Sequence, residues 1–470
     1  MKTRKTIPLR PPLDNELTSS EMSKSYVVRI VNALICTVCL CALALAADQK
    51  APTKLSDLPP EAQRAISAAL ARKLPRIDDF TLTASDGLSG DYFGYSVAIS
   101  GNTVVVGAPQ TTINGNQKQG SAYVFVKPVN GWANMTQTAE LTSSDGQPLD
   151  YFGNSVAING RTVVVGSPRS VLNGNFSQGA AYVFVEPPNG WTNMTQTAKL
   201  SASDGAAYAF FGTAAATSGD AIVVGSPYST DGNMLPGTAY VFVEPSGGWV
   251  DMTQTAELTA SDGAPNDGFG FTVSIDSNTT IVGGGQCPSC TGSAYVFVEP
   301  PNGWVDTTQT AELTPSDSEP GENFGQTVSV SGDTIAVGDP IHGFEEAGAV
   351  YVFAEPAGGW VNMTQTAELT VRGAEFACVG NSVSIAGNVI LAGADCTSLH
   401  TGAAYAFVKP AGGWQNSSKV ALKLSIPFKY RSDYFGASVA ISGNTGIVGA
   451  FYATSTGLQR PGEAFVFTEK

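Results

Sequence analysis

One segment recurs along this chain at a nearly constant interval. A Phe-Gly pair marks each copy, as Phe93-Gly94, Phe152-Gly153, Phe211-Gly212, Phe269-Gly270, Phe324-Gly325 and Phe435-Gly436, and the degenerate pair Val379-Gly380 fills the one gap. The glycines of these seven pairs are 59, 59, 58, 55, 55 and 56 residues apart. A fixed period of this size is typical of solenoids and propellers, in which each repeat is one supersecondary unit.

Each repeat predicts four β-strands, here called A to D. In the second copy they are FGNSVAI, TVVVGSP, GAAYVFV and TQTAKLS. Val, Ile, Tyr, Phe and Thr dominate these runs, and Gly, Asn, Asp and Pro separate them. Strand B is apolar almost throughout, which indicates burial on both faces. A Trp at a fixed position before strand D in six repeats indicates structural packing.

The two ends of the chain predict that the repeats close into a ring. The last repeat stops at Phe465–Phe467 without a strand D. The missing strand lies at the N-terminus, where Asp79–Thr83 precedes a Ser-Asp-Gly turn just as Ala139–Thr142 does. Closure removes exposed sheet edges, whereas an open solenoid needs capping repeats. We therefore predict an all-β, seven-bladed propeller of four-stranded blades over residues 78–470, closed by the N-terminal strand.

The N-terminal residues 1–46 have the pattern of a secretory signal peptide. The apolar run Ile30–Leu45 follows two bases and leads to a small-x-small cleavage pattern that ends at Ala46. An uncleaved membrane anchor is the alternative, although the run is short for the roughly 20 residues of a membrane span. Translation from Met22 would give ordinary signal proportions. Residues 47–77 are predicted to be a linker with a short helix, and the protein is expected to be secreted or in the cell envelope or periplasm.

Charge and cysteine content narrow the partners and the compartment. The net charge is −15, and because residues 1–46 carry +3, the remainder carries −18. An acidic surface repels phosphate backbones, which argues against nucleic acid and leaves cations and neutral polymers open. Four cysteines follow the signal segment: Cys287, Cys290, Cys378 and Cys396. An even number in an exported chain predicts two disulfides. Redox and zinc roles for Cys287 and Cys290 are the alternatives.

The order of motifs in each repeat resembles the FG-GAP repeat: Phe-Gly, then Ser-Val-Ala-Ile, then Val-Val-Val-Gly-Ala-Pro, the last of which is Val104–Pro109 in the first copy. That repeat builds the seven-bladed propeller of integrin α subunits, and the resemblance covers about residues 78–470. The short turns and the Ala-Tyr-Val-Phe-Val strands are more similar to bacterial FG-GAP proteins. The resemblance implies a binding or adhesion module, and we expect it to be a monomer. The A–B turns, such as Ser100–Thr103, lack the Asp-x-Asp-x-Asp-Gly loop that calcium requires, so the calcium sites of the family are not carried over.

Strand parity divides the loops between two faces. The A–B and C–D connections lie on one face and are monotonous, whereas the B–C loops on the other face differ in every repeat. Because function concentrates in loops, we expect the B–C and D–A face to bind a protein or polysaccharide partner. The matching face carries the ligand site in integrins, which the resemblance supports. Unselected drift in exposed loops is the alternative explanation.

The D–A loops carry recurring acids beside Gly. Asx-turn chemistry explains them, and calcium binding is the alternative. The calcium candidates are Asp86, Asp91, Asp145, Asp150, Asp262 and Asp267.

The two histidines of the chain, His342 and His400, lie in neighbouring B–C loops near Asp339, Glu345, Glu346 and Asp395. One interpretation is a metal or catalytic site shared by the two loops. The other is that these are ordinary exposed loop residues.

No catalytic constellation or phosphate-binding motif appears in the sequence. We therefore expect a protein without catalytic residues or an obligate cofactor. Two alternatives are a propeller enzyme acting on extracellular polymers and a purely structural envelope protein. Acids that converge at one channel mouth would favour the enzyme.

Overall fold

The computed structural model divides the chain into Met1–Leu74 and Pro75–Lys470. It describes residues 77–228, 236–264, 267–284, 292–317, 319–343, 346–397, 401–426, 433–453 and 461–469, all within the second unit. The predicted signal peptide, residues 47–76, Cys287, Cys290, Glu345 and His400 lie outside the described residues.

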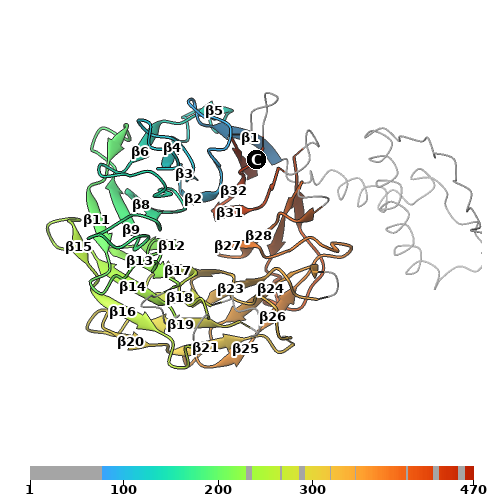
Figure 1. Ribbon diagram of the computed structural model, residues 1–470. Helices are drawn as coiled ribbons and strands as arrows, with labels where there is room; N and C mark the ends of the chain where they lie inside the picture. Colours follow the sequence, from blue (N-terminus) through green and yellow to red (C-terminus); the bar gives the residue numbers. More distant parts are fainter. Residues whose placement is uncertain are drawn as a thin grey trace, which may run out of the picture. The chain divides into compact units, whose positions relative to one another are not determined.

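Seven antiparallel sheets are arranged in a ring (Figure 1). We number the blades 1–7 by the chain order of strand A. Strand A is β2 (Ser96–Ser100), β7 (Ser155–Asn159), β12 (Ala214–Ser218), β17 (Thr272–Asp276), β22 (Thr327–Ser331), β27 (Ser382–Ala386) and β31 (Ser438–Ser442). Strand B is β3 (Thr103–Ala108), β8 (Thr162–Ser167), β13 (Ala221–Ser226), β18 (Thr279–Gly283), β23 (Thr334–Asp339), β28 (Val389–Ala394) and β32 (Thr445–Ala450).

The outer strands complete each blade. Strand C is β4 (Ser121–Val126), β9 (Ala180–Val185), β14 (Thr238–Val243), β19 (Ala294–Val298), β24 (Ala349–Ala354), β29 (Ala403–Val408) and β33 (Glu463–Glu469). Strand D is β6 (Ala139–Thr142), β11 (Ala198–Ser201), β16 (Ala256–Thr259), β21 (Ala311–Thr314), β26 (Ala367–Leu369), β30 (Leu422–Leu424) and, for blade 7, β1 (Ile77–Thr83). The predicted meander and the N-terminal strand in the last blade are therefore confirmed.

The ring closes between the first and last blades. β1 pairs antiparallel with β33 from Ile77↔Glu469 to Leu82↔Ala464. Strand A of every blade also contacts strand A of both neighbours, and β2 contacts β31 across the seam. At the same seam the Ser438 hydroxyl donates to the Gly94 carbonyl oxygen at 2.8 Å. Closure gives blade 7 the fourth strand that the C-terminal repeat lacks, and radial repetition leaves only short sheet edges.

A fifth, two-residue strand departs from the predicted four-strand blade. Two-residue segments just before strand D pair in parallel with strand D of the preceding blade, although the sequence placed their second residue, such as Thr195, in strand D of its own repeat. These strands are β5 (Met135–Thr136), β10 (Met194–Thr195), β15 (Met252–Thr253), β20 (Thr307–Thr308) and β25 (Met363–Thr364). The residue before each one repeats the link: Asn134 Oδ1 accepts from Thr81 N, and Asn193 Oδ1 from Glu140 N, both at 2.9 Å. The repeated motif therefore joins neighbouring blades.

The Phe-Gly pair is also an inter-blade contact. Phe152 is fully buried, and Gly153 has φ +91°, where L side chains are strained. A Cβ at Gly153 would overlap the Ser121 carbonyl oxygen and lie 3.1 Å from Ala108 N, both in the preceding blade. Glycine is therefore required for the close approach of two blades, and the degenerate Gly380 has the same φ of +92°.

The core is built from strands B and C and the Trp series. Val104, Val105 and Val106 are fully buried, which agrees with a strand covered on both faces. The six tryptophans are all buried and each belongs to a different core cluster: Trp132, Trp191, Trp249, Trp304, Trp360 and Trp414. Their role is packing, as their fixed spacing predicted.

Candidate functional site

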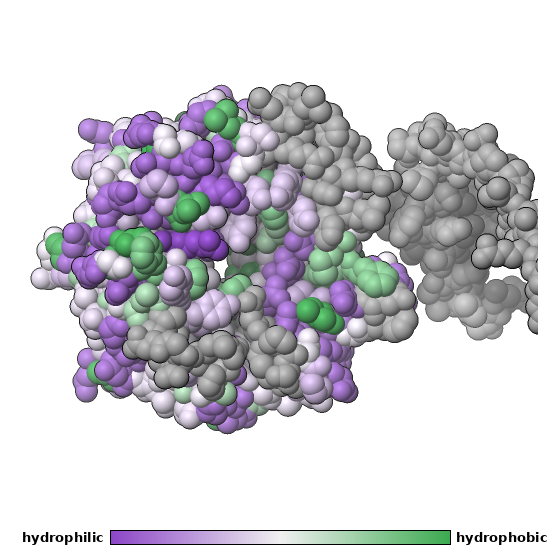
Figure 2. All heavy atoms as spheres, in the orientation of Figure 1, coloured by the Kyte–Doolittle hydropathy of each residue, from purple (hydrophilic) through white to green (hydrophobic). Residues whose placement is uncertain are grey.

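A central pocket of about 560 Å³ lies on the axis of the ring. The first residues of strand A in all seven blades line it, among them Ser96, Ser155 and Ser438. Residues from the D–A and B–C loops, namely Arg169, Phe210 and Tyr228, line it as well. The pocket therefore borders the face that carries the variable loops, which we call the variable face. Polar and apolar residues alternate over the surface of the ring (Figure 2).

The wall of the pocket mixes polar and apolar side chains and carries little charge. Hydroxyls at the start of strand A donate to the Phe-Gly carbonyl of the next blade, as Ser155 Oγ does to Gly212 O at 3.0 Å. The amide of Asn154 donates to Thr213 O at 3.1 Å, and Gln326 donates to Asn381 Oδ1 at 2.9 Å. Arg169 is the one charged side chain among the described lining residues, and no acid lies among them. Such a wall suits a neutral, hydroxyl-rich ligand better than a metal or an acid–base reaction.

An aromatic residue precedes the Phe-Gly pair in blades 7, 1, 2 and 3, and one of these residues, Phe210, lines the pocket. The residue before the Phe-Gly pair is Tyr92, Tyr151, Phe210 or Tyr434 in these blades, with φ of 62°, 57°, 53° and 54°. Left-handed φ is uncommon for bulky residues. The equivalent Gly268 and Cys378 of blades 4 and 6 have φ of 67° and 55°, so this conformation belongs to the repeat. The guanidinium of Arg169 lies 4.8 Å from the ring centroid of Tyr151 and 6.0 Å from that of Phe210. Backbone geometry thus holds large rings at the rim.

Further rings extend this set at the seam between blades 7 and 1. Tyr434 stacks on Phe451 with centroids 5.0 Å apart, and the Tyr92 ring lies 4.9 Å from the Tyr452 ring. Tyr95, which lines the pocket, contacts Phe451 edge-on at 5.6 Å. We call this group, together with Tyr151, Arg169, Phe210 and Tyr228, the aromatic arc. It was not predicted, although an aromatic residue directly before Phe-Gly in four repeats was a visible signal.

The acids of the D–A loops take two different positions. The first acid is exposed. In blade 2 it bonds to the tyrosine of strand C: Asp145 accepts from Tyr182 OH at 2.9 Å and pairs with Lys199 Nζ at 2.6 Å. Burial alone would raise the pKa of Asp145, but Lys199 and Tyr182 more than offset it and hold that pKa below its usual value. Asp86 and Asp262 are exposed at the matching positions.

The second acid is turned inward and closes a local turn. Asp91 accepts from Leu88 N and Asp150 from Gln147 N, both at 2.7 Å, and Asp267 accepts from Ala264 N at 2.5 Å. Each of these carboxylates accepts from the backbone N–H three residues earlier. This differs from an Asx turn, in which the side chain bonds to the N–H two residues later and which the sequence suggested for the Ser-Asp-Gly acids. Burial raises the pKa of Asp91, and it raises that of Asp150 to about 6. Asp91 and Asp150 are buried, at 5% and 3% exposure, and calcium at these acids remains a prediction.

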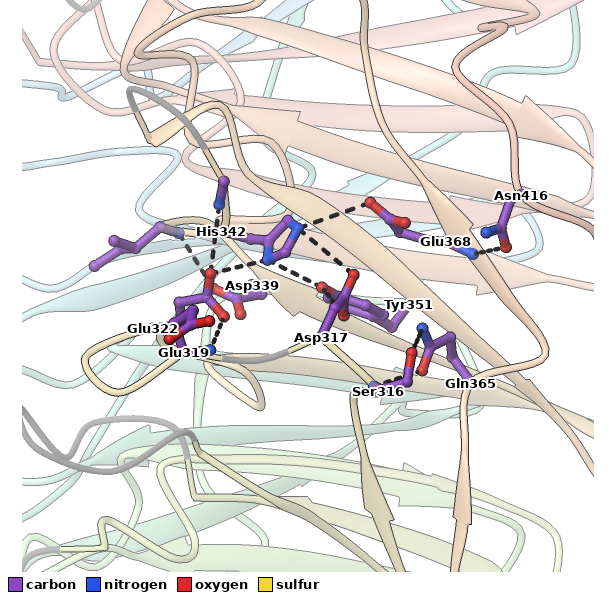
Figure 3. A network of polar contacts seen from close by, with 12 residues as sticks. Ser316, Asp317, Glu319, Glu322, Asp339, His342, Tyr351, Gln365, Glu368 and Asn416 are labelled. Atoms are coloured by element: carbon purple, nitrogen blue, oxygen red, sulfur yellow. Dashed lines mark hydrogen bonds and ion pairs between the residues drawn. The ribbon is translucent and has the colours of Figure 1, made fainter.

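Blade 5 gathers the densest polar cluster of the described residues (Figure 3). His342, in the loop after β23, has Nδ1 3.0 Å from Glu322 Oε1 and 3.0 Å from Tyr351 OH. Its Nε2 lies 3.8 Å from Glu368 Oε1 and 4.0 Å from Asp317 Oδ2. The sequence singled out His342 and nearby Asp339, but it missed the other acids.

The signal for those acids was their register in the repeat. Asp317 matches Asp145, Glu322 lies two residues before Phe324 as Asp150 does before Phe152, and Glu368 matches Lys199. The predicted partner His400 lies outside the described residues.

Cys378 and Cys396 form a disulfide with a Cα–Cα distance of 5.6 Å across 18 residues. This is one of the two bonds expected from the cysteine count. It links the residue before Val379-Gly380 to the loop after β28, and so joins a D–A loop to a B–C loop of blade 6 on the variable face.

A closed propeller with a loop-built face around a central pocket defines a class of repeat proteins that typically act as binding or adhesion modules. A family model, the FG-GAP repeat, matches residues 78–125, 135–184, 194–242, 252–297, 307–353 and 430–467. These segments cover more than half of the chain, which therefore belongs to the FG-GAP repeat family. The unmatched interval contains the degenerate Val379-Gly380 pair. No curated protein matches the chain.

Family membership sets the general compartment and class. FG-GAP propellers are typically extracellular or in the cell envelope and are not typically enzymes. The Cys378–Cys396 disulfide agrees with an oxidising compartment. Within the described residues, no helix has the length and apolar character that a membrane crossing needs.

Proposed function

We propose that this protein is an exported binding module that holds a neutral extracellular polysaccharide at the aromatic arc. The observation that carries this proposal is the joining of the aromatic arc to the pocket, because Tyr95, Phe210 and Tyr228 belong to both. Flat rings present large amphipathic surfaces at small entropic cost, and the hydroxyls and amides of the wall supply hydrogen bonds. The predicted signal peptide of residues 1–46 would bring the chain to such a partner.

Charge favours a neutral polymer over an acidic one. The chain downstream of residue 46 carries a net charge of −18, which disfavours long polyanions through electrostatic repulsion. Arg169 is the one charge in the described pocket wall, and it already stacks on Tyr151. The absence of acids from that described wall also argues against the alternative of a polymer-cleaving enzyme, which needs a pair of carboxylates at its reaction centre.

The test is affinity electrophoresis of the chain through gels that contain neutral or anionic polysaccharides. We expect retardation by a neutral polymer, and weaker retardation for Phe210→Ala and Tyr228→Ala, which remove rings from the rim. Aromatic anchors in interfaces commonly contribute about 1–3 kcal/mol each, so the retardation constant should fall by roughly 5- to 150-fold. Val129→Ser is the matched control, because Val129 is fully exposed on a C–D loop of the opposite face.

Equal retardation of the two rim variants and the wild type would contradict the aromatic arc as the binding site. Retardation by no polysaccharide, together with capture of an envelope protein that Phe210→Ala abolishes, would replace the glycan with a protein partner on the same face. A fall in the molecular mass of the polysaccharide during incubation with the protein would instead favour the alternative of a polymer-cleaving enzyme.

A further inference from the structure

Blade 5 departs from the repeat at the end of strand B. The last residue of this strand is Asp339, and the other blades have a small residue there: Ala108, Ser167, Ser226, Gly284, Ala394 and Ala450. Three residues later blade 5 has His342, where blades 1 and 2 have Thr111 and Ser170. Two chemically distinctive residues therefore replace small ones at two positions that face the same loop.

These two residues meet Glu322 from the D–A loop. One ligand atom each of Glu322, Asp339 and His342 lies within 4.8 Å of the others. Glu322 Oε1 is 3.0 Å from His342 Nδ1, as Figure 3 shows. Asp339 is fully buried and Glu322 is 9% exposed. Ligands held about 2.0–2.2 Å from one metal ion lie about 3 Å or slightly more from each other, so a small contraction would place all three on one ion.

One oxygen of Asp339 has no protein partner. Asp339 Oδ1 accepts from Asn323 N at 3.1 Å and from Ile341 N at 3.3 Å, whereas the buried Oδ2 accepts no hydrogen bond. A buried carboxylate oxygen without a donor costs free energy unless a cation or proton meets it. The fully buried Asp339 also lies beside the Glu322 carboxylate, so two carboxylates meet where one oxygen has no donor.

The surroundings add negative charge and no fixed cation. Asp317 and Glu368 flank Nε2 of His342, and burial together with Asp317 raises the pKa of Glu368. In blade 2 the position of Glu368 holds Lys199, which pairs with Asp145. Among the described residues, no Lys or Arg forms an ion pair with the four acids of blade 5.

We propose that Glu322, Asp339 and His342 Nδ1 bind one divalent first-row transition-metal ion, with zinc as the representative. Two carboxylates and a neutral imidazole match such an ion in donor type, and their charge of −2 matches it in sign and size. Glu368 and Asp317 lie on the Nε2 side, at 3.8 and 4.0 Å, so a small movement would let one of them accept the ring proton and orient the imidazole, as outer carboxylates do for metal-bound histidines. The ion would tie the D–A loop of blade 5 to its B–C loop on the variable face.

This site is separate from the calcium loops that the family resemblance implies. Those loops would lie between strands A and B, which in blade 5 is the turn Ser331–Thr334 at the other end of β23. Calcium prefers oxygen ligands only, so it should compete poorly at a site that includes an imidazole. The proposed metal site is also independent of the proposed polysaccharide site, because none of the three metal ligands lines the central pocket.

The test is zinc binding by the full chain after chelator treatment and dialysis. Calorimetry, with metal analysis of the dialysed protein, should show about one equivalent of Zn²⁺ per chain, with binding that weakens as the ligands are protonated. Zn²⁺ should also raise the melting temperature, since it binds the folded state alone. Excess Ca²⁺ should displace little of the bound Zn²⁺.

Four variants separate the outcomes. Asp339→Ser restores the residue of blades 2 and 3 and should fold, but it should lose the calorimetric signal and the melting shift; Glu322→Gln should do the same. Asp91→Asn is the matched control, because it changes the equivalent buried acid of blade 1 and should bind like the wild type. Zinc binding that survives Asp339→Ser but disappears in Glu368→Gln would overturn the assignment and place the ion at Nε2. Absence of saturable binding by the wild type would overturn the proposal altogether.

Discussion

Replacing Gly153 with alanine tests whether the Phe-Gly glycine is required by backbone conformation or by the contact between blades. Gly153 has φ +91°, and an added Cβ would overlap the Ser121 carbonyl oxygen. Gly174 has nearly the same φ, +86°, but nothing lies within 4 Å of its Cβ position. The two substitutions therefore share the conformational cost and differ in the steric one.

The expected magnitudes follow from these two terms. A left-handed conformation costs an L-residue about 1–2 kcal/mol, and Gly174→Ala should lose only that. Overpacking in a well-packed contact costs a further 1–3 kcal/mol, roughly, so Gly153→Ala should lose about 2–5 kcal/mol in total. The separation of the blades would also lengthen the bond from Ser96 Oγ to Gly153 O, which is 2.9 Å.

Urea unfolding followed by fluorescence of the buried tryptophans measures both variants. The comparison requires equal dependence of the unfolding free energy on urea, since a change in that slope signals loss of a single transition. Equal destabilisation by Gly153→Ala and Gly174→Ala would refute the close-contact argument and leave conformation as the only reason for glycine.

Three further predictions concern pH, the disulfide and the seam of the ring. Burial raises the pKa of Asp150 from 3.8 to about 6, so its contribution to folding stability is favourable below pH 4 and is lost as pH rises through 6. The unfolding free energy of Asp150→Asn, measured in urea, should therefore rise by up to about 3 kcal/mol relative to the wild type between pH 4 and 7. A difference between the two proteins that does not change with pH would contradict this. Removal of the Cys378–Cys396 bond by paired serine substitutions should cost about 2–4 kcal/mol at a closed loop of this length, and no change in the unfolding midpoint would show that the bond adds no constraint. Ser438→Ala removes the hydroxyl bonded to Gly94 O and should lower the free energy of unfolding by about 1 kcal/mol. Backbone amides at the seam between blades 7 and 1 should also exchange their hydrogens faster with solvent. Equal loss of amide protection in all blades would argue against a local effect.

The sequence contained most of the fold because a propeller repeats one local pattern. The seven Phe-Gly positions predicted the blade count, and the apolar strand B predicted its burial, as Val104–Val106 show. The strand missing after Phe467 and present at Asp79–Thr83 predicted the pairing of β1 with β33. Each of these inferences needs only neighbours in the chain or a comparison between copies, and both are visible in the sequence.

Contacts between repeats were decided by the tertiary structure. Thr195 reads locally as the start of strand D, yet Met194–Thr195 pairs with strand D of the preceding blade. The cluster around His342 likewise draws Asp317 and Glu368 from opposite ends of one repeat. Periodicity determines which residues are equivalent in successive blades, but only the packed ring determines which side chains from different loops meet at one point.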